Sequence, residues 1–96
     1  MNRVAIVSAK RTAIGSFGGS LKDVSAAKIG GELVKQSLEG INLNPSLVDE
    51  IIFGNVLQTG LGQNVARQIA VNAGIPKEKS AFVVNKVCGS GLKSVV

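Results

Sequence analysis

The sequence predicts an α/β fold in which short parallel strands alternate with helices. Three runs rich in β-branched residues have the length of strands, at residues 3–8, 50–56 and 80–85. Their apolar residues are consecutive rather than alternating, which is typical of parallel strands buried on both faces. Segments with helical spacing of apolar residues follow each run. The order β-α-β-α-β-α therefore favours right-handed crossovers, with helices covering a parallel sheet.

The first strand is expected at Arg3–Ser8, and a glycine-rich loop over residues 14–20 follows it. Ser25 is the expected N-cap of the first helix, because a serine hydroxyl accepts from a free amide of the first turn. The helical spacing is carried by Ile29, Leu33, Val34 and Leu38. Gly40 is expected at the C′ position that ends the helix.

The second strand is expected at Glu50–Val56, after a short helical turn capped by Asn44 and Pro45. A loop containing Gly60 and Gly62 then leads to Asn64, which is the expected N-cap of a second helix.

The second helix has a narrow stripe of small and apolar residues, formed by Ala66, Ile69, Ala70 and Ala73. Small residues allow close packing, and Gly74 and Pro76 end the helix. The third strand is expected at Ser80–Asn85, and a last helix over Gly91–Val96. A sheet of three strands has two exposed edges, and the predicted helices are too short to cover both of its faces well. The fold is therefore expected to be incomplete in 96 residues.

The composition excludes several classes of site within this chain. One cysteine and no histidine leave no intrachain disulfide, no cysteine-rich zinc site and no histidine base. The 11 Lys and Arg against 6 Asp and Glu are dispersed, and 3 Phe are the only aromatic residues, so no nucleic-acid partner is expected. No apolar run is long enough for a membrane span. A single thiol without a targeting segment predicts a cytoplasmic protein.

Cys88 is the candidate catalytic residue, because it lies at a tight turn between a predicted strand and a helix. Amides at a helix N-terminus favour a thiolate, and Gly89 and Gly91 allow a sharp turn with room for a substrate. Lys86 and Lys93 are near enough in sequence to add to this effect. The alternative is a buried structural cysteine, which is the commoner role of a lone thiol.

A second interpretation treats the same glycines as a phosphate cradle. Residues 89–94, Gly-Ser-Gly-Leu-Lys-Ser, resemble a nucleotide-binding loop only in part. The dinucleotide fingerprint requires Gly or Ala at Ser94, and the P-loop requires Gly at Leu92. A nucleotide- or phosphate-binding α/β module therefore remains an alternative, as does a non-catalytic fragment.

Three stretches in order resemble the thiolase family, specifically its acetyl-CoA acetyltransferases. They are residues 11–21, residues 54–68 and the nucleophile motif Asn85–Lys93. The resemblance spans essentially the whole chain. Ala13 and Val65 stand where many members have proline, at a loop and a helix start where the change affects rigidity rather than chemistry.

The resemblance implies a thiolase-like layered fold, with residues 1–96 as the first part of its N-terminal domain and no internal boundary. It implies that Cys88 forms an acyl-enzyme from acetyl-CoA, which a second acetyl-CoA converts to acetoacetyl-CoA and CoA, or the reverse thiolysis. The histidines and second cysteine of the family would come from beyond residue 96. Gln63, Asn64 and Arg67 would lie near the active site and the dimer contact, although a helix cap and a surface arginine are the commoner roles of such residues.

Further expectations follow from the same resemblance. CoA thioesters are the substrates, no cofactor or metal is required, and the whole protein is a homodimer or homotetramer.

Overall fold

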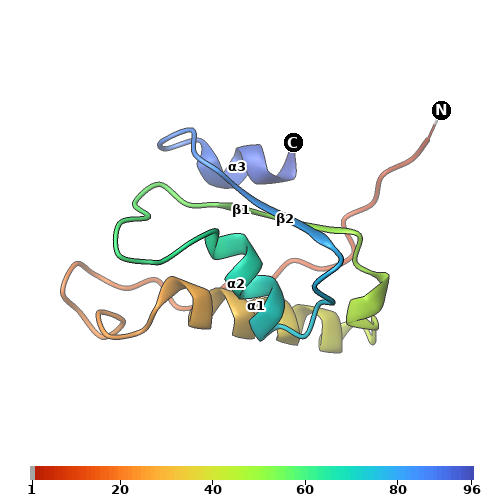
Figure 1. Cartoon of the computed structure of the whole chain (residues 1–96), viewed down its shortest axis with the longest axis horizontal. Helices are drawn as coiled ribbons and strands as arrows, with labels where there is room; N and C mark the ends of the chain where they lie inside the picture. Colours follow the sequence, from red (N-terminus) through yellow and green to blue (C-terminus); the bar gives the residue numbers. More distant parts are fainter. Residues whose placement is uncertain (1) are drawn as a thin grey trace.

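The computed structural model describes residues 2–96 and contains three helices, one 3₁₀ turn and two strands (Figure 1). In chain order they are α1 (Ala26–Gly40), η1 (Pro45–Leu47), β1 (Glu50–Gly54), α2 (Val65–Asn72), β2 (Ser80–Val84) and α3 (Ser90–Val95). From residue 26 onward, this order agrees with the order predicted from the sequence.

The sheet consists of β1 and β2, which pair in parallel from Glu50 opposite Ser80 to Gly54 opposite Val84. Helix α2 forms the crossover between them. Helices α1 and α2 lie on one side of the sheet and α3 lies on the other (Figure 1). The prediction of a parallel sheet with helices on its faces is therefore confirmed.

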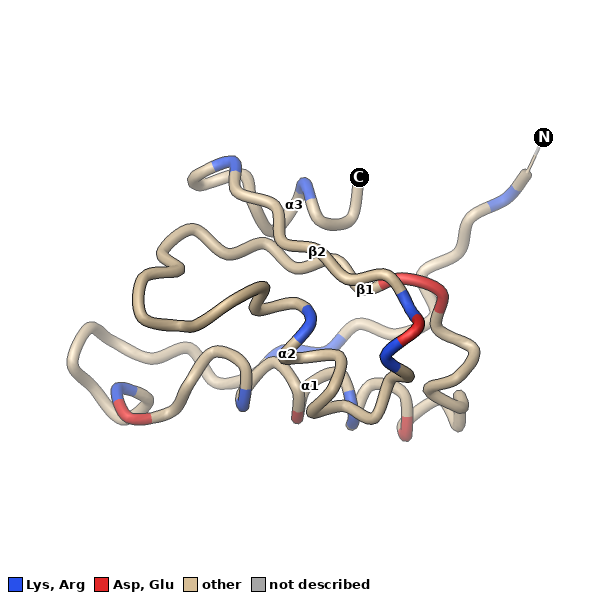
Figure 2. The backbone as a smooth tube through the Cα atoms, viewed as in Figure 1, with Lys and Arg blue, Asp and Glu red and all other residues tan. Residues whose placement is uncertain are grey.

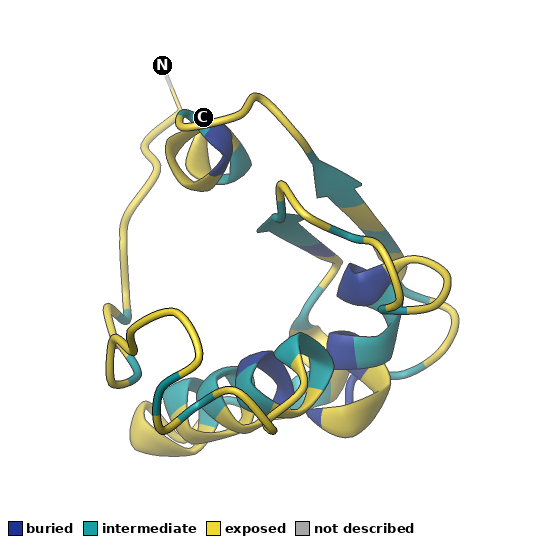
Figure 3. Ribbon diagram, turned by 90° about the vertical axis from the view of Figure 1, so that its left-hand side faces the viewer, coloured by how far each residue is buried: buried dark blue, intermediate teal, exposed yellow. Residues whose placement is uncertain are grey.

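The strand predicted at Arg3–Ser8 is wrong for this structure. Residues 2–16 belong to no helix or strand, and the side chains of Val4 and Ile6 are 97% and 80% exposed. A strand requires a neighbour that accepts its backbone hydrogen bonds, and β1 and β2 are paired only with each other over the described residues. The segment instead runs as an exposed chain, away from the sheet (Figure 3).

The core lies where α2 meets α1 and the sheet. Its buried residues are Ile51, Val65, Ala66, Ile69, Ala70 and Ile75. Two glycines of α1 allow the helices to approach closely, since a Cβ on Gly30 would lie 2.6 Å from Ile69 Cδ1. Figure 3 shows buried segments on both α1 and α2. The small-residue stripe of α2 therefore packs as the sequence predicts.

Helix α1 begins as predicted but ends differently. The Ser25 hydroxyl accepts from the Lys28 amide at 3.1 Å, which confirms the N-cap. Gly40 is the last helical residue rather than the C′ residue, which is Asn42 with a φ of 55°. The Leu43 amide donates to the Leu38 carbonyl, as in a Schellman motif. Asparagine is the side chain that best replaces glycine in this conformation.

Two smaller predictions are confirmed. The Asn44 side chain accepts from the Ser46 amide at the start of η1. Val65 is the first residue of α2, a position where proline is also favoured, so the replacement of proline by valine leaves the helix start intact.

The charged residues are spread along the chain (Figure 2). No helix among residues 2–96 is both long enough and apolar enough to span a bilayer.

Candidate active-site turn

Cys88 lies in the turn that joins β2 to α3, two residues before the first residue of the helix. Its neighbour Gly89 is the N-cap residue of α3, with no side chain to cap it. Cys88 is exposed. The structure thus confirms the predicted strand-turn-helix position and differs from the alternative of a buried cysteine.

Val87, directly before the cysteine, has a left-handed backbone with a φ of 48°. A β-branched residue rarely adopts this conformation, because its Cβ substituents crowd the following carbonyl. Such backbones persist only where surrounding contacts hold them. The sequence suggests that Gly89 and Gly91 permit the sharp turn, whereas the unusual backbone conformation in the structure is that of Val87.

Side chains on both sides of the turn hold Val87. The Asn85 side-chain oxygen accepts from the Val87 amide at 3.0 Å, and its side-chain nitrogen donates to the Val56 carbonyl at 3.3 Å. The Ser90 hydroxyl donates to the Val87 carbonyl at 2.7 Å and accepts from the Lys86 amide at 2.8 Å. Neither side chain was predicted from the sequence to have this role. An Asn directly after a strand is the sequence signal, because its side-chain oxygen can accept from the amide two residues later and form an Asx turn.

Helix α3 is seated on β1 through Gly54. A Cβ on Gly54 would lie 2.5 Å from the carbonyl carbon and oxygen of Ser90, so only glycine leaves room for the helix at this distance. Ser90 itself is 4% exposed. The sheet therefore fixes how closely the first residue of α3 approaches β1, and with it the position of the turn that carries Cys88.

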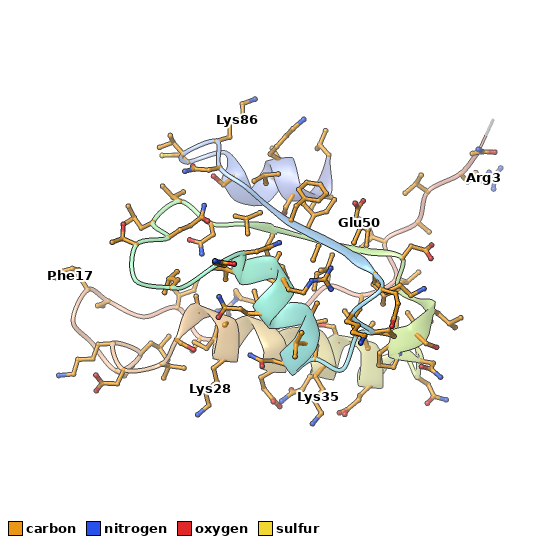
Figure 4. The ribbon with its side chains drawn as sticks, in the orientation of Figure 1. Arg3, Phe17, Lys28, Lys35, Glu50 and Lys86 are labelled. Atoms are coloured by element: carbon orange, nitrogen blue, oxygen red, sulfur yellow. The ribbon has the colours of Figure 1, made fainter. Side chains whose placement is uncertain are left out.

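The two lysines of the motif flank the turn on the solvent side. The Lys86 side chain extends outward from it (Figure 4). Lys86 and Lys93, with Gly89, Leu92 and Val96, line a hollow of about 370 Å³ beside the turn. Cys88 does not line this hollow. Two cationic side chains at its wall favour an anionic occupant over a cationic one.

The amides of Gly89 and Ser90 give no support to the alternative of a phosphate-binding loop. The Gly89 amide donates to the Lys86 carbonyl at 3.0 Å, and the Ser90 amide donates to the Val87 carbonyl at 3.1 Å. Anion sites of this kind need amides that point at the ligand. These two groups are already used within the turn.

The polar residues at the start of α2 have structural contacts. Asn64 caps the helix by accepting from the Arg67 amide, and its side-chain nitrogen donates to the Ala81 carbonyl. Arg67 is half-buried and donates through Nη2 to the Lys79 carbonyl, while its Nη1 is buried with no partner among the described residues. The backbone carbonyl of Gln63 accepts a hydrogen bond from the side-chain nitrogen of Gln68. The predicted helix cap is confirmed, but Arg67 is more than a surface residue.

Comparison with known families decides the identity of this fold. Residues 4–96 match the family model described as "Thiolase, N-terminal domain". The chain belongs to the thiolase family. A crystal structure of a thiolase from Ascaris suum in complex with coenzyme A superposes with a TM-score of 0.88 at 43% identity, covering 92% of this chain and 23% of that one.

Curated thiolase relatives agree. An acetyl-CoA acetyltransferase from Clostridioides difficile is 54% identical over 94 residues, which cover 98% of this chain and 88% of the relative. An acetyl-CoA acetyltransferase from Syntrophomonas wolfei and a probable acetyl-CoA acyltransferase from Staphylococcus aureus are each 54% identical. These alignments cover 96% and 99% of this chain but only 23% and 24% of those relatives. The thiolase-like fold expected from the sequence is thus shown, over about a quarter of the length of the longer relatives.

Proposed function

We propose that this chain supplies the nucleophilic segment of an acetyl-CoA C-acetyltransferase, with Cys88 as the residue that carries the acyl group. Residues 1–96 would then be the first part of the N-terminal domain, without an internal boundary. The observation that carries the proposal is the exposed thiol of Cys88, which directly follows Val87 and its left-handed backbone in the turn. The names of the relatives support the choice of acetyl-CoA as substrate.

In the first half-reaction, the Cys88 sulfur attacks the carbonyl carbon of acetyl-CoA as a thiolate. The tetrahedral adduct collapses by breaking the bond to the CoA sulfur, which leaves with a proton as free CoA. The product is a thioester between the acetyl group and Cys88. The base that takes the thiol proton is not a histidine of residues 1–96, since they contain none.

In the second half-reaction, a base removes an α-proton from another acetyl-CoA. The carbanion attacks the acetyl carbon on Cys88, a carbon–carbon bond forms, and the Cys88 sulfur leaves as a thiolate. The product is acetoacetyl-CoA, and thiolysis is the reverse sequence. A thioester suits both steps, because sulfur is a good leaving group and the α-protons of thioesters are comparatively acidic.

The turn is suited to this cycle because the same sulfur must act as nucleophile and as leaving group. A rigid support keeps the thiol in one place through both steps, which reduces the entropy lost at each attack. Gly89 and Gly91 carry no side chain, and a Cβ on Gly91 would meet nothing within 4 Å. The space beside Gly91, three residues after Cys88, is therefore open.

The proposal includes a homodimer or homotetramer as the working form and coenzyme A thioesters as substrates, with no metal or cofactor. It also includes a cytoplasmic location, since an exposed free thiol such as Cys88 persists best in a reducing compartment.

The test is acetyl-CoA added to the whole protein without an acceptor. We expect one acetyl group on the peptide that contains Cys88, detected by mass spectrometry, and we expect hydroxylamine to remove it as a thioester. Cys88→Ala should abolish both the label and turnover, while Cys88→Ser keeps the size of the side chain and serves as the matched control for folding. A label that persists in Cys88→Ala would place the nucleophile elsewhere and contradict the proposal.

A further inference from the structure

Ser90 carries a buried hydroxyl that is used twice within the turn. It is the polar side chain that the structure buries among residues 2–96, at 4% exposed. The hydroxyl donates to the Val87 carbonyl and accepts from the Lys86 amide. The Ser90 oxygen thus bridges the amide of Lys86 and the carbonyl of Val87. Ser90 is itself the first residue of α3, which packs closely on Gly54 of the sheet.

Val87 is the residue that needs this support. Its side chain is 64% exposed, so packing does not force its left-handed backbone. Its amide is held by Asn85 and its carbonyl by Ser90. Without the hydroxyl, valine is expected to return to the extended or right-handed regions that β-branched residues prefer. That change of φ would turn the following residue, Cys88, to another direction.

We propose that Ser90 is a positioning residue, which directs the Cys88 thiol by holding Val87 in its left-handed conformation. The proposal rests on the proposed function of Cys88 as nucleophile. It adds that reactivity toward a thioester depends on a hydroxyl that itself touches no substrate. The buried location of Ser90 supports this role, since the hydroxyl faces the turn and is closed to solvent.

The experiment compares Ser90→Ala with the unaltered full-length protein in single-turnover acetylation by acetyl-CoA. We expect the acetylation rate at saturating acetyl-CoA to fall at least about tenfold, with the acetyl-CoA concentration for half-saturation unchanged, because misdirection of a nucleophile affects the chemical step. Alkylation of Cys88 by iodoacetamide, a small reagent that attacks from many directions, should change less than about twofold, because the thiol remains exposed. The matched control is Ser94→Ala, since the Ser94 hydroxyl also donates to the carbonyl three residues earlier, but this carbonyl is that of Gly91 and not that of Val87.

A second substitution separates direction from packing. Val87→Asn introduces a residue that tolerates the left-handed region. In the Ser90→Ala background it should restore at least about a third of the lost rate, since its backbone no longer depends on the hydroxyl. A serine needed only for packing in the helix would not be replaced by a change at residue 87.

Each outcome decides the proposal. Acetylation that survives in Cys88→Ala contradicts the proposed function, whatever Ser90 does. Loss of acetylation in Cys88→Ala together with a normal rate in Ser90→Ala contradicts the positioning role alone. An equal fall in acetylation and alkylation, without rescue by Val87→Asn, also overturns it. If Ser90→Ala does not fold, Ser90→Gly replaces it, and a normal acetylation rate in that variant would overturn the proposal, because glycine likewise supplies no hydroxyl to hold Val87.

Discussion

Gly54 of β1 lies directly beneath the backbone of Ser90 at the start of α3. The closest approach of a Cβ built on Gly54 is 2.5 Å, to the carbonyl carbon and oxygen of Ser90. Backbone atoms cannot rotate away as the end of a long side chain can. The sheet and the candidate active-site turn are therefore joined by a contact that has no room for even one methyl group.

Gly54→Ala is expected to destabilise the protein by about 1–3 kcal/mol and to slow acetylation of Cys88, because α3 must move away from the sheet. Urea unfolding of the whole protein measures the first effect and single-turnover acetylation the second. Gly91→Ala is the matched control for the unfolding measurement, since a Cβ there meets nothing within 4 Å and alanine favours helix. Equal stabilities of the two variants would show that the tight approach is absent in solution.

Gly31→Ala is expected to weaken the contact between α1 and α2 by about 1–3 kcal/mol. A Cβ on Gly31 would lie 2.5 Å from the Asn72 Cβ, and the Asn72 side chain would lose its hydrogen bond to the Ala27 carbonyl. Gly40→Ala, in the same helix, meets only the flexible end of Lys10 and should be neutral or slightly stabilising. Thermal unfolding of both variants checks the contrast, which disappears if the helices are separated in solution.

Asn64→Ala is expected to cost more stability than Ser25→Ala, although both remove a helix N-cap. Ser25 contributes one capping bond, worth about 1 kcal/mol. Asn64 adds a bond to the Ala81 carbonyl and a φ of 38° that alanine tolerates poorly. Asn64→Gly should lie between the two, since glycine accepts the backbone but makes no side-chain bond. Chemical denaturation gives the three values, and an Asn64→Ala effect no greater than that of Ser25→Ala would refute the expectation.

Asp49→Asn is expected to change the stability by less than about 0.5 kcal/mol. The carboxylate is 3.9 Å from the Lys79 Nζ, but the Asp49 side chain is 98% exposed. Solvent screens such a pair, and ordering two mobile side chains offsets the attraction. Unfolding at low and high salt measures the contribution, and a loss that vanishes in high salt but exceeds this bound would reveal a stronger pair.

Local signals predicted most of the elements after residue 25. Ser25 and Asn64 cap their helices as expected, and both strands of the sheet lie within the predicted runs. These features depend on neighbours a few positions away, so a single sequence contains them. The strand at Arg3–Ser8 failed, because a strand also needs a partner edge that local sequence does not provide.

The site was predicted at the level of position but not of conformation. Cys88 was found from its turn between a strand and a helix, which sequence patterns reveal. The glycines around it predicted a sharp turn, and the residue in that turn with a left-handed backbone is Val87. Valine gives no sequence signal for that conformation, because it is imposed by the bonds from Asn85 and Ser90.

The parallel register has a consequence for the order of folding. Each residue of β1 pairs with a residue thirty positions later, from Glu50 with Ser80 to Gly54 with Val84. Closing such a loop carries an entropic cost that a local turn does not. Since α3 is seated on Gly54, the turn at Cys88 reaches its final form only after β2 has joined β1. The appearance of acetylation competence during refolding should therefore report the closure of this long loop, and should lag behind the formation of the helices.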